Sequence, residues 1–106
     1  MYYRVKARYI PEAAAELYCR LTDGSIAGQK PDGREIVASM QRARITEPGV
    51  ACWSAVCYCP TPLEHERQTV YDRFFTDMQI EEVEDYGPFA GQPLMDHLAR
   101  SASETP

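Results

Sequence analysis

The sequence predicts a single α+β domain. Residues 2–10 alternate between apolar and charged or polar side chains, which is typical of a half-buried strand. Residues 14–21 carry apolar side chains at helical spacing, and residues 50–59 form an uncharged run of strand length. Elements of both kinds therefore alternate along one short chain.

The first strand places Tyr3, Val5, Ala7 and Tyr9 on one face and basic residues on the other. Pro11 suits the first turn of a helix, where its missing N–H costs nothing. The apolar stripe of that helix consists of Ala14, Leu17, Tyr18 and Leu21. Asp23-Gly24 is a stop signal.

Residues 33–40 fit two structures. Ile36, Val37 and Met40 lie on one face of a helix, and Asp32 followed by Glu35 resembles a capping box. The same residues also fit a long strand, with Ile36 and Met40 on one side. Residues 41–46 are predicted to be a strand under either interpretation, followed by a turn at 47–49.

The uncharged residues 50–59 predict a strand that is buried on both faces. After them, Thr61, Pro62 and Glu64 match a capping box with Thr61 as the N-cap and proline at the first helical position. We therefore expect a helix from residue 62. Its apolar face would carry Leu63, Val70, Tyr71, Phe74 and Met78.

The last part of the chain predicts a short acidic strand over residues 79–86 and a loop over 87–93. A short C-terminal helix carrying Leu94 and Leu98 follows. The domain thus spans residues 1–100, and residues 101–106, which have nothing to pack, are predicted to be a disordered tail.

The predicted order β-α-β-β-α-β, with an extra helix before the second strand in one interpretation, resembles the ferredoxin-like arrangement over residues 2–86. The resemblance implies a four-stranded antiparallel sheet of order 4-1-3-2 with helices on one face. Many such domains pair through their sheets as dimeric α/β barrels, among them cofactor-free monooxygenases. In this order the last strand lies beside the first, so Glu81, Glu82 and Glu84 would face Arg4, Lys6 and Arg8.

Charge excludes some functions. The net charge is −5, divided as +2 over residues 1–53 and −7 over 54–106. An acidic chain without a basic patch is a poor binder of nucleic acids or anionic membranes. No apolar run is long enough to span a bilayer, and residues 1–6 do not resemble a signal peptide. The expected location is the cytoplasm.

The four cysteines are expected to be reduced and free of metal. Cys57, Cys59 and His65 do not match the usual zinc spacings, and a fourth ligand would have to be an aspartate or the distant His97. Cys59 is also a possible reactive thiol, because it precedes a helix whose dipole would lower a thiol pKa. His65 lies opposite the apolar stripe and is expected to be solvated.

A few residues suggest a ligand site on the sheet. Arg4 and Lys6 on the first strand, with Trp53 or Tyr58 on the central one, would suit a small anionic or aromatic molecule if they share the open face. Tyr2 and Tyr3 are further aromatic candidates. Arg67 lies within an apolar helix face, either as an anion-binding group or paired with Glu64 or Glu66.

Two functional hypotheses follow. In the first, a small homodimeric cytosolic domain binds a small molecule at the sheet face, either as a binding protein or as a cofactor-free enzyme. In the second, the chain is a structural or interaction protein whose sheet face serves as a dimer interface. The dimer is expected because the free face would carry Trp53 or Tyr58, unless residues 87–100 cover it. No Ser-His-Asp set, phosphate loop or nucleotide fingerprint indicates a cofactor or a reaction.

Overall fold

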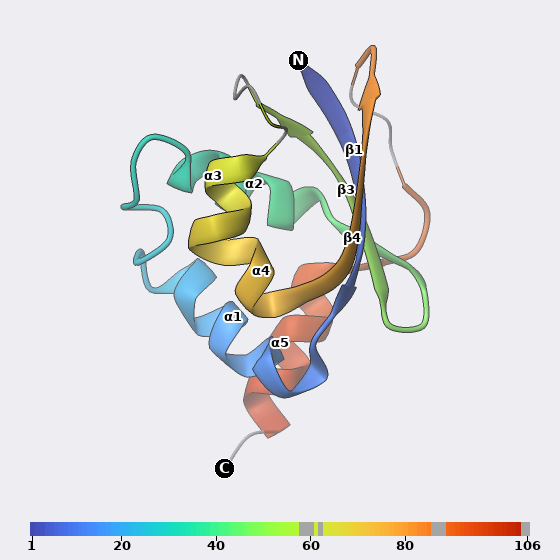
Figure 1. Cartoon of the computed structure of the whole chain (residues 1–106). Coiled ribbons are helices and arrows are strands. Elements are labelled where there is room, and N and C mark those ends of the chain that lie inside the picture. Colours follow the sequence, from blue (N-terminus) through green and yellow to red (C-terminus); the bar gives the residue numbers. More distant parts are fainter. Residues whose placement is uncertain (58–60, 62, 86–88, 105–106) are drawn as a thin grey trace.

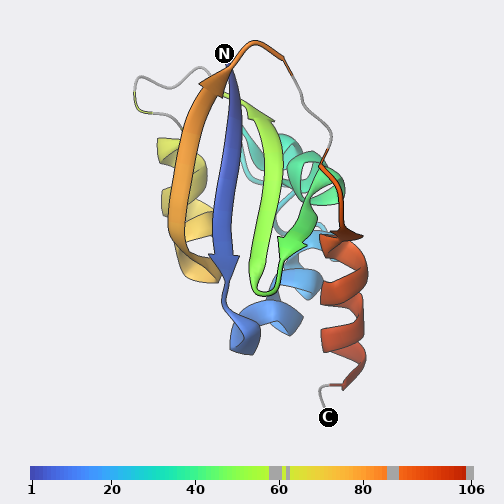
Figure 2. The same cartoon turned by 90° about the vertical axis from the view of Figure 1, so that its right-hand side faces the viewer.

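A computed structural model describes residues 1–57, 61, 63–85 and 89–104 (Figure 1). The chain forms an α+β domain in which helices cover one face of a five-stranded antiparallel sheet. The sheet order is β4-β1-β3-β2-β5. Figure 2 views the sheet from the side that no helix covers.

The first strand and helix agree with the sequence pattern. β1 (Tyr2–Tyr9) buries Tyr3, Val5 and Ala7 and exposes the side chains between them. A 3₁₀ turn (Pro11–Ala13) leads into α1 (Ala14–Thr22), whose buried residues are Ala14, Leu17 and Leu21. The alternation of period two and the helical spacing are therefore confirmed.

The ambiguous segment is a helix. α2 (Gly33–Arg42) buries Ile36 and Met40, while Val37 is half-buried. The strand alternative is wrong, because the buried residues Gly33, Ile36 and Met40 follow helical spacing, whereas Ala38, which a strand would place on the same side as Ile36 and Met40, is only half-buried. Asp32 occupies the N-cap position but makes no side-chain cap bond, so the predicted capping box is not formed.

The second and third strands form a hairpin. β2 (Arg44–Glu47) turns through Gly49, with φ +80°, into β3 (Val50–Val56). Residues 50–55 are all buried, which confirms the prediction that both faces avoid water. β3 lies between β1 and β2 in the sheet.

The next helix begins later than predicted. It runs as α3 (Glu64–Glu66), a π-helical turn (Arg67–Tyr71) and α4 (Asp72–Phe74). Leu63, with φ 58° and a fully buried side chain, is the N-cap residue, and no side chain caps the helix. The prediction of Thr61 as N-cap was wrong, because a turn in which the Glu64 N–H donates to the Thr61 carbonyl precedes the helix. Pro62 lies outside the described residues.

The fourth strand is longer than its acidic part. β4 (Phe75–Val83) begins directly after α4, so Met78, predicted on the helix, is a half-buried strand residue. β4 pairs with β1 on one side and forms an edge of the sheet. The register shifts between Lys6 and Arg8, opposite Asp77, which has a left-handed φ of 54°. This is a β-bulge.

A fifth strand was not predicted. β5 (Gln92–Pro93) pairs with β2, so the expected four-stranded sheet is wrong in strand number, although β1 to β4 keep the predicted order. Gly91 precedes β5 with φ +126°, and a Cβ there would lie 2.1 Å from the Ile45 carbonyl oxygen. The chain can therefore approach β2 this closely only through glycine.

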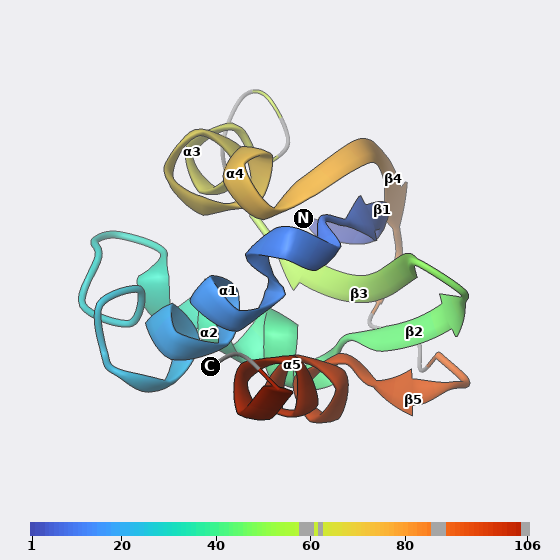
Figure 3. The ribbon, with the colours of Figure 1, turned by 90° about the horizontal axis from the view of Figure 1, so that it is seen from below.

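The final helix is longer than expected. α5 (Leu94–Glu104) continues through residues 101–104, which the sequence assigned to a disordered tail, and that part of the prediction was wrong. Figures 1 and 3 place α5 beside α1, with Leu94 and Leu98 in the core. α5 thus packs on the helix side and does not cover the open face.

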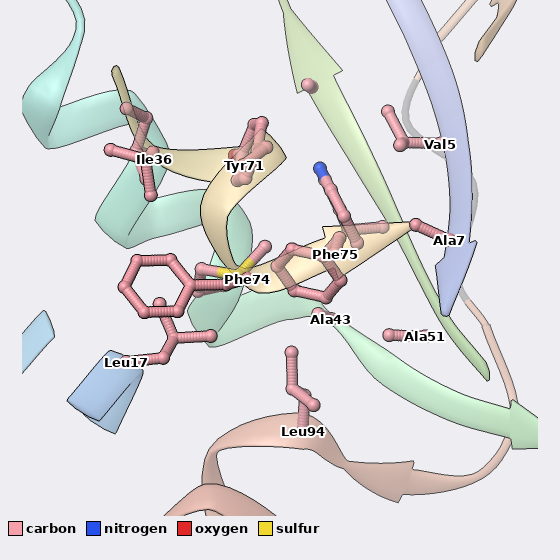
Figure 4. Packing of buried hydrophobic residues seen from close by; sticks show 14 of the residues in the cluster. Val5, Ala7, Leu17, Ile36, Ala43, Ala51, Tyr71, Phe74, Phe75 and Leu94 are labelled. Atoms are coloured by element: carbon pink, nitrogen blue, oxygen red, sulfur yellow. The ribbon is translucent and has the colours of Figure 1, made fainter. Parts of the chain in front are cut away.

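The core lies between the sheet and the helices. Figure 4 shows Val5 and Ala7 of β1 directed toward Tyr71 and Phe75, with Leu17 and Leu94 approaching from the helices. Trp53 is fully buried in this cluster, and its ring lies 5.2 Å from that of Tyr71 and 5.0 Å from that of Phe75. Trp53 is paired with Val5 of β1, so both side chains point to the helix side.

The position of Trp53 removes the main reason for expecting a dimer. The open face carries charged residues of β1, and large apolar side chains that are exposed in the described residues are limited to Met1 and Tyr2. Tyr58 lies outside the described residues. The homodimer stays a prediction, without an apolar patch in the described part of the chain to support it.

Candidate functional site

β1 places basic side chains side by side on the open face. Residues two apart on a strand share a face, so Arg4, Lys6 and Arg8 form a row beside the unexposed Cys52 and Ser54 of β3, with which Lys6 and Arg4 are paired. Cys52 and Ser54 are small, and the side chains of Arg4 and Lys6 beside them are long. This difference in length leaves room above the sheet. The sequence pattern of β1 was therefore sufficient to predict this row.

The row lines a hollow of about 440 Å³, a volume within the range of small-molecule sites. The residues that line it come from four strands, β1 to β4, and from the segment after β4: Arg4, Lys6, Thr46, Cys52, Gln79, Ile80, Glu81 and Phe89. A second hollow of about 170 Å³ shares Lys6 and Gln79 with the first and continues to Arg8 and Asp77. We call the larger one the sheet-face hollow.

Ion pairs hold the basic side chains in place. Arg4 Nη2 lies 2.8 Å from Glu81 Oε1, on the strand position directly opposite. Lys6 Nζ lies 3.3 Å from Glu47 Oε1, and Arg8 Nε lies 3.7 Å from Asp77 Oδ2. Of the predicted pairings, that of Arg4 with Glu81 is confirmed, whereas Lys6 pairs with Glu47 of β2 and Arg8 pairs with Asp77, an earlier residue of β4. Such exposed pairs contribute at most about 1 kcal/mol each, so a ligand can replace them.

The other predicted site residues that the structure describes, Trp53 and Arg67, do not line this hollow. Trp53 was expected on the open face, but it lies in the core. Arg67 is on the π-helical turn, where its Nε donates to Asp72 Oδ1 at 3.2 Å, rather than to Glu64 or Glu66. Tyr58 and Cys59 lie outside the described residues. Of the five candidate ligand residues, the structure brings Arg4 and Lys6 together.

A second polar cluster was not predicted from the sequence. His65 Nδ1 is hydrogen-bonded to Asp32 Oδ2 at 2.7 Å, so His65 is not simply solvated. Glu66, with 2% of its surface exposed, accepts a hydrogen bond from the Cys57 thiol at 3.8 Å. The cluster lies where the N-terminal ends of α2 and α3 meet the end of β3. We call it the buried acid cluster.

Burial determines the protonation of this cluster. Desolvation, together with a hydrogen bond and charge from Asp32, raises the pKa of Glu66 from 4.5 to about 7. Desolvation also raises the pKa of Tyr71, and the Glu66 and Glu35 carboxylates add to this effect. A carboxyl group with a pKa near neutrality can donate or accept a proton under ordinary conditions.

A signal for Glu66 exists in the sequence. Glu66 follows Leu63 by three residues and precedes Val70 by four, which places a carboxyl group on the apolar stripe of the helix. Arg67 was expected on that stripe, but the structure buries its neighbour Glu66 instead. Asp32 carries no comparable signal, because its contact with His65 joins residues 33 positions apart.

Metal binding finds no support in the described residues. Within them, no group of three or more histidine, cysteine, aspartate or glutamate side chains is arranged to hold an ion. Cys19 is exposed, and Cys52 and Cys57 are buried thiols. The metal-free state of the four cysteines stays a prediction.

Comparisons of the chain with protein-family models, curated proteins and solved structures found no match. In the described part of the chain, no helix combines the length and apolar character that crossing a bilayer requires. Function therefore has to be argued from the site itself.

Proposed function

We propose that the chain binds a small carboxylate-bearing molecule with an apolar or aromatic part in the sheet-face hollow. The observation that carries this proposal is the pair of basic side chains, Arg4 and Lys6, beside one acidic side chain in a hollow of about 440 Å³. The lining carries two positive charges and one negative charge, and Glu47, which pairs with Lys6 from outside the lining, balances the second positive charge.

The lining matches the two parts of such a ligand. The guanidinium of Arg4 offers paired N–H donors that suit a carboxylate, and Lys6 adds a second positive charge. Phe89 supplies apolar surface at the same hollow. A ligand carboxylate would replace Glu81 as the ion-pair partner of Arg4. Because Glu81 is exposed to water, the loss of this partner would not leave a buried, unpaired carboxylate.

Resemblance to ferredoxin-like domains agrees with this proposal at the level of architecture. β1 to β4 have the order 4-1-3-2, and the ligand would lie on the face opposite the helices. The fifth strand and α5 are additions to that arrangement. The alternative of an interaction protein without a ligand has no separate observation in its favour.

The proposal is tested by calorimetric titration of the protein with phenylacetate and, separately, with the neutral phenylacetamide. The two probes share ring and shape, so we expect only the carboxylate to bind well. Arg4→Met keeps the aliphatic stem and should weaken phenylacetate binding about tenfold, since a charge-assisted hydrogen bond is lost. Lys6→Met should also weaken it.

Arg20→Met is the matched control, because Arg20 forms an exposed ion pair with Glu16 at 2.9 Å on α1, away from the hollow. It should leave phenylacetate binding unchanged. Equal binding of the two probes, or an equal loss in Arg4→Met and Arg20→Met, would contradict the proposal.

A further inference from the structure

A separate groove lies at the opposite end of β1 from the N-terminus. It runs between the segment Tyr9–Ala15 and α5, which Figure 3 shows beside each other. Its volume is about 510 Å³, and its lining includes Tyr9, Glu12, Ala15, His97, Ser101 and Glu104. None of these residues belongs to the sheet-face hollow.

The charge of the groove is negative. Glu12 and Glu104 are exposed, and neither forms an ion pair with another residue in the parts of the chain that the structure describes. By contrast, Glu16 on the same helix side pairs with Arg20 and Arg73. Two carboxylates without a cationic partner, on a chain of net charge −5, attract positive ligands.

Two aromatic rings line the same groove as the carboxylates. The rings of Tyr9 and His97 have centroids 4.9 Å apart and are tilted by 45°, and both side chains are half-buried. A half-buried tyrosine ring offers its π face to a cation. Contact with His97 holds that ring in place, so binding would require little reordering.

The size and spacing of the lining favour an organic cation over a metal ion. Although Glu12, His97 and Glu104 line one groove, the described residues include no set of three such groups close enough to hold an ion. A volume of about 510 Å³ suits a molecule of several carbon atoms. An aliphatic amine with separated charges would contact both carboxylates and lay its methylene groups against the ring.

We propose that the groove between Tyr9 and α5 is a binding site for aliphatic amines that carry more than one positive charge. The carboxylates of Glu12 and Glu104 each take one ammonium group, and the Tyr9 ring covers the chain between them. The site is independent of carboxylate binding on the sheet face.

The site is tested by titration with spermidine at low ionic strength. Binding is measured by calorimetry and by the shift of the imidazole NMR signals of His97. Glu12→Gln and Glu104→Gln should each weaken binding about two- to fivefold, as expected for one exposed ion pair. Tyr9→Leu should weaken it by a similar factor. Because Glu12 and Glu104 are exposed, their variants are expected to fold normally.

The matched control is Glu84→Gln, which removes an exposed carboxylate beyond the end of β4. It should leave spermidine binding unchanged, and Glu12→Gln should leave phenylacetate binding unchanged. The proposal is overturned if Glu84→Gln weakens spermidine binding as much as Glu12→Gln does, since attraction would then come from the net charge. Absence of a shift at His97 would overturn it as well.

Discussion

Glu66 is a carboxyl group that the fold keeps away from water. Glu66 accepts a hydrogen bond from the Cys57 thiol and lies beside the Asp32 carboxylate, which is itself hydrogen-bonded to His65. The side chains of Glu35, on α2, and Tyr71, on the π-helical turn, belong to the same surroundings. Most of these neighbours are acidic or neutral. The protonated form of Glu66 is therefore favoured, which makes the stability of the domain depend on pH.

The direction of this dependence follows from the pKa. Burial first, and Asp32 second, raise the pKa of Glu66 from 4.5 to about 7, so the folded chain holds this proton more tightly than the unfolded chain. The associated stability is complete below pH 4.5 and is lost as the pH rises through 7. The loss amounts to at most about 3 kcal/mol.

Glu66→Gln should remove this loss, because an amide stays neutral at every pH. Compared with the unmodified chain, the variant should be more stable at pH 8 and similar at pH 4.5, in urea unfolding followed by the fluorescence of Trp53. Glu64→Gln, which changes the exposed carboxylate two positions earlier, is the control. Equal pH profiles for the unmodified chain and Glu66→Gln would show that Glu66 is not the responsible group.

At the scale of elements, the addition of β5 depends on one glycine. Gly91→Ala would place a methyl group 2.1 Å from the Ile45 carbonyl oxygen at a φ of +126°. We expect a loss of about 3 kcal/mol or more in the free energy of unfolding. Gly24→Ala has a φ of +89° but open space around the new atom, so it should cost about 1 kcal/mol. Similar losses in the two variants would mean that β5 does not approach β2 this closely.

The start of α3 offers a second test at this scale. Thr61 makes no side-chain cap bond to the helix, so Thr61→Ala should change the free energy of unfolding by less than about 0.5 kcal/mol. Leu63→Ala removes a fully buried side chain and should cost about 2–5 kcal/mol. If Thr61→Ala instead lowers the free energy of unfolding by about 1 kcal/mol, the result would support the capping box that the sequence predicted.

Local patterns predicted the elements that have one wet and one dry face. β1 and α1 each bury one side, and the spacing of their apolar residues shows which. The pattern of α2 fitted a strand as well as a helix, so it did not decide the structure of this element. β3 has no such contrast, because residues 50–55 are buried on both faces. The side to which Trp53 points is set by its pairing with Val5, a contact 48 positions away that the sequence of β3 does not contain.

The candidate site follows the same division. Arg4 and Lys6 could be predicted because β1 alternates clearly. The hollow above them could not, because it also needs Phe89 from the segment after β4 and Thr46 from β2. The buried acid cluster depends on three chain segments meeting at the end of β3, which no local pattern records.

For the whole molecule, the charge of the open face sets the properties of any dimer that uses it. The three ion pairs of β1 lie on this face with side chains roughly half exposed or more. Two copies paired there would be held largely by charges, which salt screens over about 10 Å at 0.1 M. A homodimer that uses the open face should therefore dissociate as ionic strength rises.

Light scattering at micromolar concentration and increasing sodium chloride measures this directly. A mass twice the 12.0 kDa of one chain at low salt, falling toward 12.0 kDa at high salt, is the expected result for a dimer through the open face. A dimer that persists at high salt would have to use another, apolar surface. Glu47→Lys, which removes the partner of Lys6, should also weaken a dimer on the open face.

The exposed edge at β4 also affects how the molecule behaves in crowded solution. An edge strand can serve as a template on which another chain extends the sheet, and this is one route to fibrils. β4 ends in the carboxylates of Glu81 and Glu82, and the bulge at Asp77 bends its backbone. Both features oppose templating: like charges repel a second copy, and the bulge disrupts the register. The repulsion disappears when the carboxylates are protonated, so concentrated protein should be most prone to fibril formation in acid.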